Sequence, residues 1–566
     1  MIRPAPPLRL AFLAVALLSA CAAAEGGWAG EAGFTPSPSN AFGAYLAGRF
    51  ATSEADTRTA ADSLLATLRA DPDQPEVVSR AFLATLLDER PEATRLARRL
   101  PDMPLAAMLI AGTEAQAGRW DRAEQRLRTL PRQGPAQLLQ PLLMAWVLHG
   151  KGQTDAAVTM LRPLAEGGRL RSLYALHAAM ICDLSGRARE AERFVRIAIG
   201  DSQPPTLRLV QVSAGILARG GKAQEGERLI ESLARAQDEL ALAMGNQARR
   251  QMLTGRVVAS PVEGMAEAYL ALAGALQGRG GADYSLALTR LALRLRPDFA
   301  AARLLAANIL SDEGQHAAAL AELDRIGRDD PLAGMVSLRR AGFLDRLDRT
   351  EEAIAEFLRA AAAYPDASQP HARLGDMLRV RQRWDEAAAA YDEAIRRVGS
   401  PAAGHWPLFY ARGIAHERGG RWPSAEADFR HALELSPDQP YVLNYLGYTW
   451  VERGENLAEA RRMLERAVAL RPQDGNIADS LGWALFKLGD IPGAIRWLER
   501  AVELEPRSSV INDHLGDAYW RAGRRREAQF QWRRALALGP EGDEGPKIEA
   551  KLRGGLPDNP MAANRR

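Results

Sequence analysis

Residues 481–506 read LGWALFKLGDIPGAIRWLERAVELEP, and the spacing of the small, bulky and proline residues in this stretch decides the fold. Gly482 is followed by Ala494 twelve residues later, by Leu498 after four more and by Pro506 after another eight. This spacing predicts a first helix that carries Gly482 and a second helix that carries Ala494 and Leu498. The stretch therefore predicts one helical hairpin, which Pro506 ends.

The same spacing recurs along the second half of the chain with a period of about 34 residues. The small residues are Ala307, Ala341, Gly375, Gly413, Gly447, Gly482 and Gly516. The alanines that follow them are Ala319, Ala353, Ala387, Ala425, Ala460, Ala494 and Ala528, and the bulky residues are Leu323, Phe357, Tyr391, Phe429, Leu464, Leu498 and Trp532. Most units end at a proline, namely Pro331, Pro365, Pro437, Pro472, Pro506 or Pro540. A fixed period of this length predicts a stack of similar units and favours a binding surface over an active site.

Each residue type in this pattern has a physical reason. A small residue on the first helix lets the second helix of the same unit approach closely, and the alanine on the second helix is its counterpart. The bulky residue one turn later is expected to fill the space between neighbouring units. The proline lacks an N–H group and restricts the residue before it, so it ends the second helix.

This pattern strongly resembles the tetratricopeptide repeat. The resemblance implies an all-α fold, a right-handed superhelical solenoid of about thirteen helix pairs. The first half of the chain carries the pattern in worn form, and its small residues include Gly48, Ala111, Ala145, Ala179 and Ala214. The unit near Phe82–Leu100 is degenerate. The register slips between Gln237 and Gly264, and a further helix pair is expected at about Met265–Leu295.

Composition supports a solenoid that does not bind nucleic acid. The chain has 566 residues, which a stack of repeats accommodates without a single large core. The 73 basic and 70 acidic residues leave a net charge of only +3, and no long basic run occurs, so nucleic acid is not the expected partner.

The start of the chain resembles the signal of a bacterial lipoprotein. Arg3 and Arg9 give the first nine residues a positive charge. The apolar run Leu10–Leu18 that follows is too short to span a membrane as a mature helix. The run ends in Leu18-Ser19-Ala20-Cys21, which resembles the lipobox and implies that Cys21 is lipid-modified after cleavage. An ordinary secretory signal with an incidental cysteine is the alternative.

The residue after Cys21 is Ala22, which by analogy with Gram-negative lipoproteins favours the outer membrane, with the protein facing the periplasm. Residues 21–40 are rich in Ala, Gly, Ser and Pro and are expected to form a flexible tether.

The sequence offers no catalytic or metal-binding motif. The eight histidines form no H-E-x-x-H pattern, and no pair of cysteines is available for a zinc site, since Cys182 is the only cysteine besides Cys21. Neither a phosphate-binding loop nor a nucleophile elbow is present. We therefore expect a protein that is not an enzyme and binds no cofactor or metal, with Cys182 buried as a small apolar residue.

A partner is expected on the inner surface of the solenoid, which the first helices line. In the last three full repeats the residues at these positions are Tyr441, Asn444, Tyr448, Asn476, Asp479, Trp483, Phe486, Asp513, Asp517 and Trp520. Aromatic rings beside amide and carboxylate groups suit an extended peptide or a partner helix. The alternative is that the aromatic rings pack between repeats and that the polar groups tie neighbouring helices together.

Two stretches, 443–449 and 484–490, with the lipobox, give the chain a resemblance beyond the repeat itself. The chain resembles the large tetratricopeptide lipoproteins of Gram-negative bacteria. One such group consists of outer-membrane adaptors that bind a periplasmic carboxyl-terminal processing protease and help it degrade peptidoglycan hydrolases. The resemblance implies such a protease and its substrates as partners. A structural component of an envelope export system, for polysaccharide, pilus or protein secretion, is the alternative.

These observations divide the chain into seven segments. We expect a signal peptide at 1–20, the tether at 21–40, a degenerate repeat array at 41–236, an irregular insertion or joint at 237–264, a middle array at 265–400, a C-terminal array at 401–540, and a capping helix with a disordered tail at 541–566. Within the joint, the loop Gly255–Pro261 is expected to be a flexible insertion or an exposed partner contact.

Overall fold

The computed structural model describes residues 41–131, 134–167, 170–200, 206–236, 242, 246–277 and 281–556. Within these ranges the regular structure is helical and contains no strand, which confirms the predicted all-α class. The chain divides into two compact units between Pro101 and Asp102, a point inside the segment predicted as one N-terminal array. The predicted signal peptide, Cys21, the tether and the last ten residues lie outside the described residues.

The first unit contains two helix pairs. They are α1 (Ala41–Ser53) with α2 (Thr57–Ala70), and α3 (Pro75–Leu87) with the short α4 (Glu92–Ala97). Gly48 on α1 lies directly against Leu64 on α2, because a Cβ at Gly48 would be 2.8 Å from the Leu64 Cγ. The worn copy of the pattern in this unit therefore forms the expected close approach. The degenerate sequence near Phe82–Leu100 forms only a short second helix, α4, of six residues.

The second unit begins with four helix pairs. They are α5 (Pro104–Gln116) with α6 (Trp120–Arg128), α7 (Gly134–Gly150) with α8 (Thr154–Gly167), α9 (Arg171–Leu184) with α10 (Ala188–Gly200), and α11 (Leu207–Arg219) with α12 (Ala223–Ala236). The predicted small residues of their first helices, Ala111, Ala145, Ala179 and Ala214, are all completely buried. The worn pattern therefore keeps its register through this part.

The segment predicted to be an irregular joint contains a helix and a fixed loop. Helix α14 (Asn246–Thr254) packs against α11 and α12. In the loop that follows, the carbonyl oxygen of Gly255 accepts a hydrogen bond from Arg219, and that of Val257 accepts one from Arg296. Val258 is 3% exposed. Two arginines and the buried Val258 thus hold the loop, while Gly255, Arg256 and Ala259 remain exposed.

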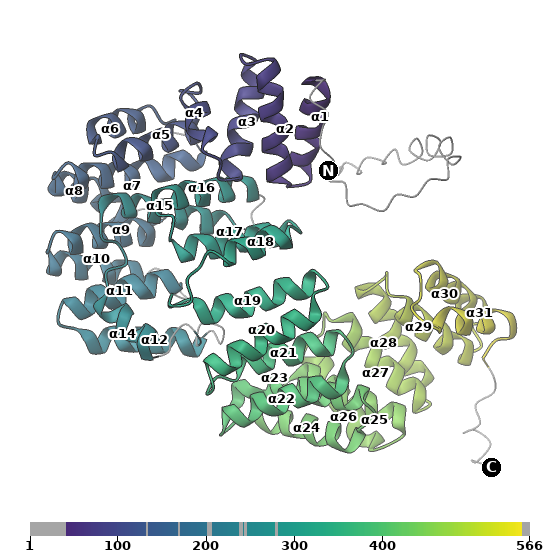
Figure 1. The fold of residues 1–566 in the computed structure, drawn as a ribbon. Helices are drawn as coiled ribbons and strands as arrows, with labels where there is room; N and C mark the ends of the chain where they lie inside the picture. Colours follow the sequence, from purple (N-terminus) through teal and green to yellow (C-terminus); the bar gives the residue numbers. More distant parts are fainter. Residues whose placement is uncertain are drawn as a thin grey trace, which may run out of the picture. The chain divides into compact units, whose positions relative to one another are not determined.

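The next helix pair turns back against the first helices of the preceding pairs (Figure 1). This pair consists of α15 (Pro261–Leu276) and α16 (Ala282–Leu295). Helix α15 packs against α5, α7 and α9, and α16 packs against α5. Gly264 lies so close to Trp146 on α7 that a Cβ would be 2.3 Å from the ring, and the Tyr269 hydroxyl donates to the Met108 carbonyl oxygen at 3.3 Å. The surface that a partner was expected to use in these repeats is thus occupied by the chain itself.

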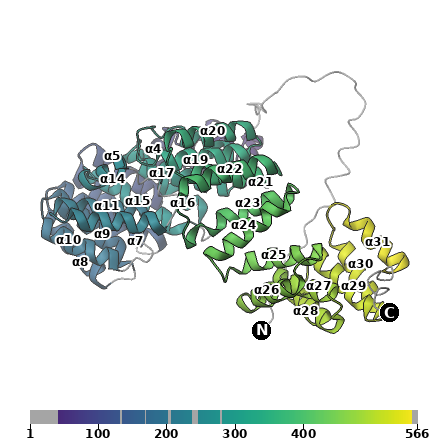
Figure 2. The same ribbon diagram turned by 90° about the horizontal axis from the view of Figure 1, so that it is seen from below.

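Seven further pairs follow one another along the rest of the chain (Figure 2). They are α17 (Ala300–Asp312) with α18 (His316–Leu323), α19 (Ala333–Arg346) with α20 (Thr350–Ala363), α21 (Gln369–Val380) with α22 (Trp384–Val398), α23 (Trp406–Arg418) with α24 (Trp422–Leu435), α25 (Pro440–Arg453) with α26 (Leu457–Leu470), α27 (Gly475–Lys487) with α28 (Ile491–Leu504), and α29 (Ser509–Arg521) with α30 (Arg525–Ala537). A short 3₁₀ helix, η1 (Ala403–His405), precedes α23, and a final helix, α31 (Glu544–Gly554), packs against α30. The described residues thus contain fourteen pairs where about thirteen were predicted.

The repeated glycines and bulky residues meet inside each pair. A Cβ at Gly375 would lie 2.7 Å from the Tyr391 ring, and one at Gly482 would lie 2.7 Å from the Leu498 Cγ. The bulky residue was expected to fill the space between neighbouring units, but it covers the glycine of its own unit. The reason is that these bulky side chains extend from the second helix onto the first, where a glycine or an alanine leaves them room.

Candidate partner-binding face

The ten residues predicted to line a groove lie on the first helices α25, α27 and α29, and they differ in accessibility. Tyr441 is 43% exposed and Asn476 is also exposed. Five others are half-buried: Asn444, Tyr448, Trp483, Phe486 and Trp520. The three aspartates, Asp479, Asp513 and Asp517, are each at least 93% buried. The accessible surface is therefore aromatic and amide in character and lies mainly on α25 and α27.

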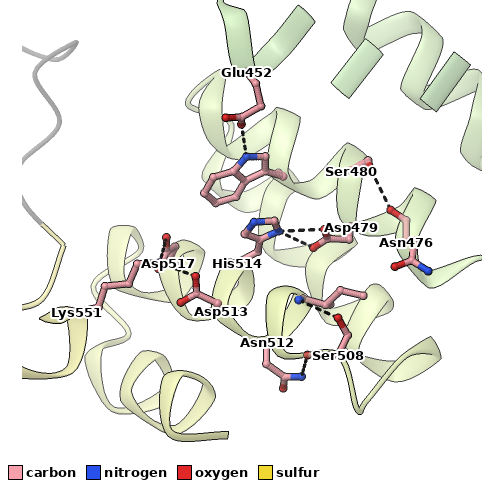
Figure 3. A network of polar contacts seen from close by, with 12 residues as sticks. Glu452, Asn476, Asp479, Ser480, Ser508, Asn512, Asp513, His514, Asp517 and Lys551 are labelled. Atoms are coloured by element: carbon pink, nitrogen blue, oxygen red, sulfur yellow. Dashed lines mark hydrogen bonds and ion pairs between the residues drawn. The ribbon is translucent and has the colours of Figure 1, made fainter. Parts of the chain in front are cut away.

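Trp483 is fixed at the centre of this surface. Its ring stacks on Phe486 of the same helix at a centroid distance of 5.0 Å and on His514 of α29 at 4.0 Å. Its indole N–H donates to the Glu452 carboxylate of α25 at 2.6 Å (Figure 3). One side chain thus connects three consecutive first helices while remaining half-exposed, which gives a rigid aromatic platform at low cost in conformational entropy.

His514 and Asp479 form a buried pair under this platform (Figure 3). The His514 Nδ1 lies 3.0 Å from both carboxylate oxygens of Asp479 and donates to them, since a carboxylate can only accept. Burial alone lowers the pKa of His514, but the carboxylates of Asp479, Asp513 and Asp517 outweigh it and leave the pKa raised. The imidazole therefore favours its charged form beneath Trp483, where a cation is attracted to the ring face.

Asp513 and Asp517 hold a lysine of the last helix. The Lys551 Nζ on α31 lies 2.7 Å from Asp513 Oδ2 and 2.8 Å from Asp517 Oδ2 (Figure 3). The other oxygen of Asp517 accepts a hydrogen bond from the Trp532 indole at 2.9 Å. These two aspartates therefore tie α31 to the last repeat instead of facing an open groove.

Helix α25 supplies the most accessible part of the surface. The Tyr441 ring lies beneath the guanidinium of Arg471 at 5.9 Å. The Asn444 Oδ1 is buried and has no hydrogen-bond partner. Burial, with Glu452, Asp479 and Glu544 nearby, raises the pKa of Tyr448, so its hydroxyl remains a hydrogen-bond donor at neutral pH. Tyr441 therefore offers an exposed ring and the half-buried Tyr448 a hydroxyl donor to a bound chain, whereas the Asn444 Oδ1 is buried.

Both interpretations that the sequence left open therefore apply, but to different residues. Asp479 and Trp483 tie consecutive first helices, and Asp513 and Asp517 tie α31 to the last repeat. Tyr441 and Asn476, in contrast, are exposed. Sequence reasoning missed Glu452, His514 and Lys551. The available signal was sequence separation, because the pairs that join them to Trp483, Asp479, Asp513 and Asp517 are 31 to 38 residues apart, close to one repeat.

Among the described residues, no three His, Cys, Asp or Glu side chains cluster closely enough to hold a metal ion. Cys182 is fully buried, and burial raises the pKa of its thiol to about 12, so it is a poor nucleophile. No helix in the described ranges has both the length and the apolar character needed to cross a bilayer.

Residues 304–509 carry tetratricopeptide repeats, because the tetratricopeptide repeat family model matches residues 304–368, 338–404, 372–440, 410–456 and 451–509. Repeats of this kind generally serve as a non-catalytic scaffold for protein interaction.

The relatives are similar in their repeats. The TPR repeat-containing protein PA4667 of Pseudomonas aeruginosa is 28% identical over 158 residues, which cover 28% of this chain and only 26% of that protein. A chain of the APC/C hetero-tetramer Cut9–Hcn1 matches over 92% of this chain and 97% of its own length, with 14% identity and a TM-score of 0.36. Yeast Tom70 matches 82% of this chain and 98% of its own with 14% identity and a TM-score of 0.35.

Proposed function

We propose that this chain is a lipid-anchored scaffold that faces the periplasm and binds a protein partner on the inner surface of α25 and α27. The observation that carries the proposal is the difference between the two parts of the second unit. Helix α15 covers the first helices α5, α7 and α9. Tyr441 and Asn476 remain exposed and Trp483 remains half-exposed. A partner therefore has access to first-helix side chains near the C-terminal end.

The partner that we propose is a periplasmic carboxyl-terminal processing protease together with its cell-wall hydrolase substrates. The support is the resemblance of residues 443–449 and 484–490 to the lipoprotein adaptors of such proteases. The surface fits an extended or helical protein segment, because aromatic anchors and amide groups together recognise side chains and backbone. A scaffold of this kind acts by raising the effective concentration of protease and substrate, on the order of mM for a short linkage.

Attachment to the membrane is the second part of the proposal. Cys21 would carry the lipid, and α1 begins 20 residues later. On α1, Phe42, Leu46 and Phe50 are 66%, 49% and 68% exposed and lie on one face, because they are four residues apart. Arg49 is exposed beside them, and α1 contains no acidic residue. Such a face suits shallow insertion among phospholipid headgroups next to the anchor.

Affinity purification from detergent-solubilised envelopes tests the proposed partner. The full chain should retain a protease and a peptidoglycan hydrolase, and the double variant Tyr441→Ala, Asn476→Ala should retain roughly tenfold less, as expected for the loss of an aromatic anchor. The control is Phe530→Ala, which removes a still more exposed ring, 60% against 43% for Tyr441, from the second helix α30. Retention of export proteins instead, or equal retention by both variants, would contradict the proposal.

A further inference from the structure

The Lys551 ammonium group lies between the carboxylates of Asp513 and Asp517 on the last repeat (Figure 3). We call this two-carboxylate cation-binding site the Asp513–Asp517 seat. The Asp513 and Asp517 carboxylates that form the seat belong to residues only 7% and 3% exposed. They lie four residues apart on α29 and so point to the same side of the helix. Two buried carboxylates this close require a positive charge between them, which Lys551 supplies at 2.7 and 2.8 Å.

Lys551 does not satisfy every hydrogen-bond acceptor of the two carboxylates. The Asp517 Oδ1 is satisfied by the Trp532 indole, but the Asp513 Oδ1 is buried without any hydrogen-bond partner. An unmet acceptor on a buried carboxylate is costly, and native structures contain few of them. The seat can therefore accept at least one more N–H donor than the present arrangement provides.

Helix α31 packs against the last repeat in the way that an amphipathic helix packs in a groove. Ile548 is 1% exposed, and Leu552 and Leu556 pack partly buried against the core that contains Trp520 and Trp532. Ile548 and Leu552 are four residues apart on α31, and Lys551 lies three residues after Ile548. Leu556 follows the end of the helix, beyond Gly555 with its positive φ. Anchors at such spacing are the usual pattern of a helix bound in a groove.

The attachment of α31 to the repeats is narrow. Ile548 is the one fully buried residue of the helix. Within the described residues, the polar side-chain contacts that leave α31 run through Lys551, since Lys547 and Arg553 pair with acids of α31 or the residue preceding it. The connection from α30 contains Gly539 and Gly542, both with positive φ. A competing helix would therefore have to replace the two ion pairs of Lys551 and one apolar edge.

We propose that the Asp513–Asp517 seat and the adjoining Trp520 surface bind a lysine-bearing amphipathic helix of the partner protein, and that α31 is the built-in occupant which this helix displaces. The matching pattern in the partner helix is an aliphatic residue, a lysine three positions later and an aliphatic residue directly after that lysine. This proposal rests on the proposed function and names the chemistry of the partner segment.

The test uses the full chain and a fluorescein-labelled synthetic peptide of residues 543–556, with a second peptide that carries Lys551→Gln. The first peptide should bind the Lys551→Gln chain at least tenfold more tightly than the unaltered chain, because the variant's own α31 no longer fills the seat. The second peptide should bind that variant at least tenfold more weakly than the first. A chain with Lys547→Gln serves as the control, since Lys547 is exposed on the same helix, and it should behave like the unaltered chain.

Equal affinity of the two peptides for the Lys551→Gln chain, or no binding of the first, would overturn the proposal and leave α31 as a permanent cap. Hydrogen exchange on the unaltered chain gives a second measurement that does not depend on the variant's folding. Excess first peptide should speed exchange in α31 while α29 stays protected, and unchanged exchange in α31 would count against displacement. Neither result depends on capture of a protease, so failure here is distinguishable from failure of the proposed function.

Discussion

Gly482 and its equivalents set the distance between the two helices of a unit through the absence of one carbon atom. At Gly413 a Cβ would lie 2.7 Å from the Phe429 ring, and at Gly516 it would lie 2.5 Å from the Trp532 ring. Contacts this short do not occur in relaxed cores, so the bulky side chain would have to move. The period of about 34 residues therefore reflects a close contact between two helices that recurs once in each repeat.

Substitution of Gly482 by alanine should destabilise the C-terminal repeats by about 1–3 kcal/mol, because the added Cβ would lie 2.7 Å from the Leu498 Cγ and overpacks the pair. Gly342→Ala is the matched control. Gly342 is also helical, has open space around its Cβ position, and should be stabilised by up to about 1 kcal/mol through helix propensity. Urea unfolding followed by circular dichroism measures both, and equal effects would contradict the packing argument.

Two buried histidines should make the stability of the chain respond to pH in opposite directions. The Trp146 indole donates to His177 Nδ1 at 2.9 Å, and burial lowers the pKa of His177 to about 3. Stability from neutral His177 is therefore complete above the unfolded pKa of about 6.5 and falls by about 1.4 kcal/mol per pH unit below it. The pKa of His514 is raised, so its contribution is complete below about 6.5 and is lost as the pH rises through the raised pKa.

Hydrogen exchange, corrected for intrinsic rates, separates the two histidines because it reports local opening. Helices α7 and α9 should lose protection at pH 5 relative to pH 7, and α27 and α29 should lose protection at pH 9 relative to pH 6. Replacement of His514 by Gln should flatten the alkaline response and leave the acid response of α7 unchanged. Loss of protection in both regions at the same end of the pH range would show that the assignments are wrong.

The pairing of helices could be predicted from the sequence, but the position of α15 could not. Gly482, Ala494 and Leu498 predict a helix pair, because residues of the same types recur at the same spacing in each unit of the C-terminal half. The contact of Gly264 with Trp146 occurs once and joins positions 118 residues apart, so no periodic signal accompanies it. At the candidate site, the exposed Tyr441 and Asn476 follow from helix register. The contacts of Glu452, His514 and Lys551 depend on the rotation of one unit relative to the next.

Replacing Gly264 by leucine should loosen α15 from the surface it covers. Even a Cβ would lie 2.3 Å from the Trp146 ring, which is fully buried and cannot move without disturbing α7. We expect a loss of about 1–3 kcal/mol and faster hydrogen exchange in α15 and α7. Gly274→Leu, a change on the same helix at an exposed position with no atom within 4 Å, should leave exchange in both helices close to its original rate.

Along the chain as a whole, the proposed activities lie at opposite ends of the sequence. The lipid on Cys21 and the apolar face of α1 belong to the N-terminal end, and the accessible surface of α25 and α27 belongs to the C-terminal end. The helix pairs between them are bound to their neighbours through buried alanines and glycines and through ion pairs one repeat apart, such as Arg381 with Asp345 and Arg219 with Asp183. Contacts between neighbouring pairs are therefore what keeps the helices stacked within each of the two units.

Membrane attachment through two signals gives the last prediction. A chain with Cys21→Ala lacks the lipid and should bind vesicles of phosphatidylethanolamine and phosphatidylglycerol weakly, through Phe42 and Phe50 of α1. Burial of one phenylalanine contributes about 1.5–3 kcal/mol, so Phe42→Ser with Phe50→Ser in that background should abolish co-sedimentation with vesicles. Phe530→Ser, which removes a ring 60% exposed on α30, is the control and should not reduce it. In cells, intact-mass measurement of the unaltered protein should find residue 21 acylated and N-terminal, and an unmodified residue 21 would refute the anchor.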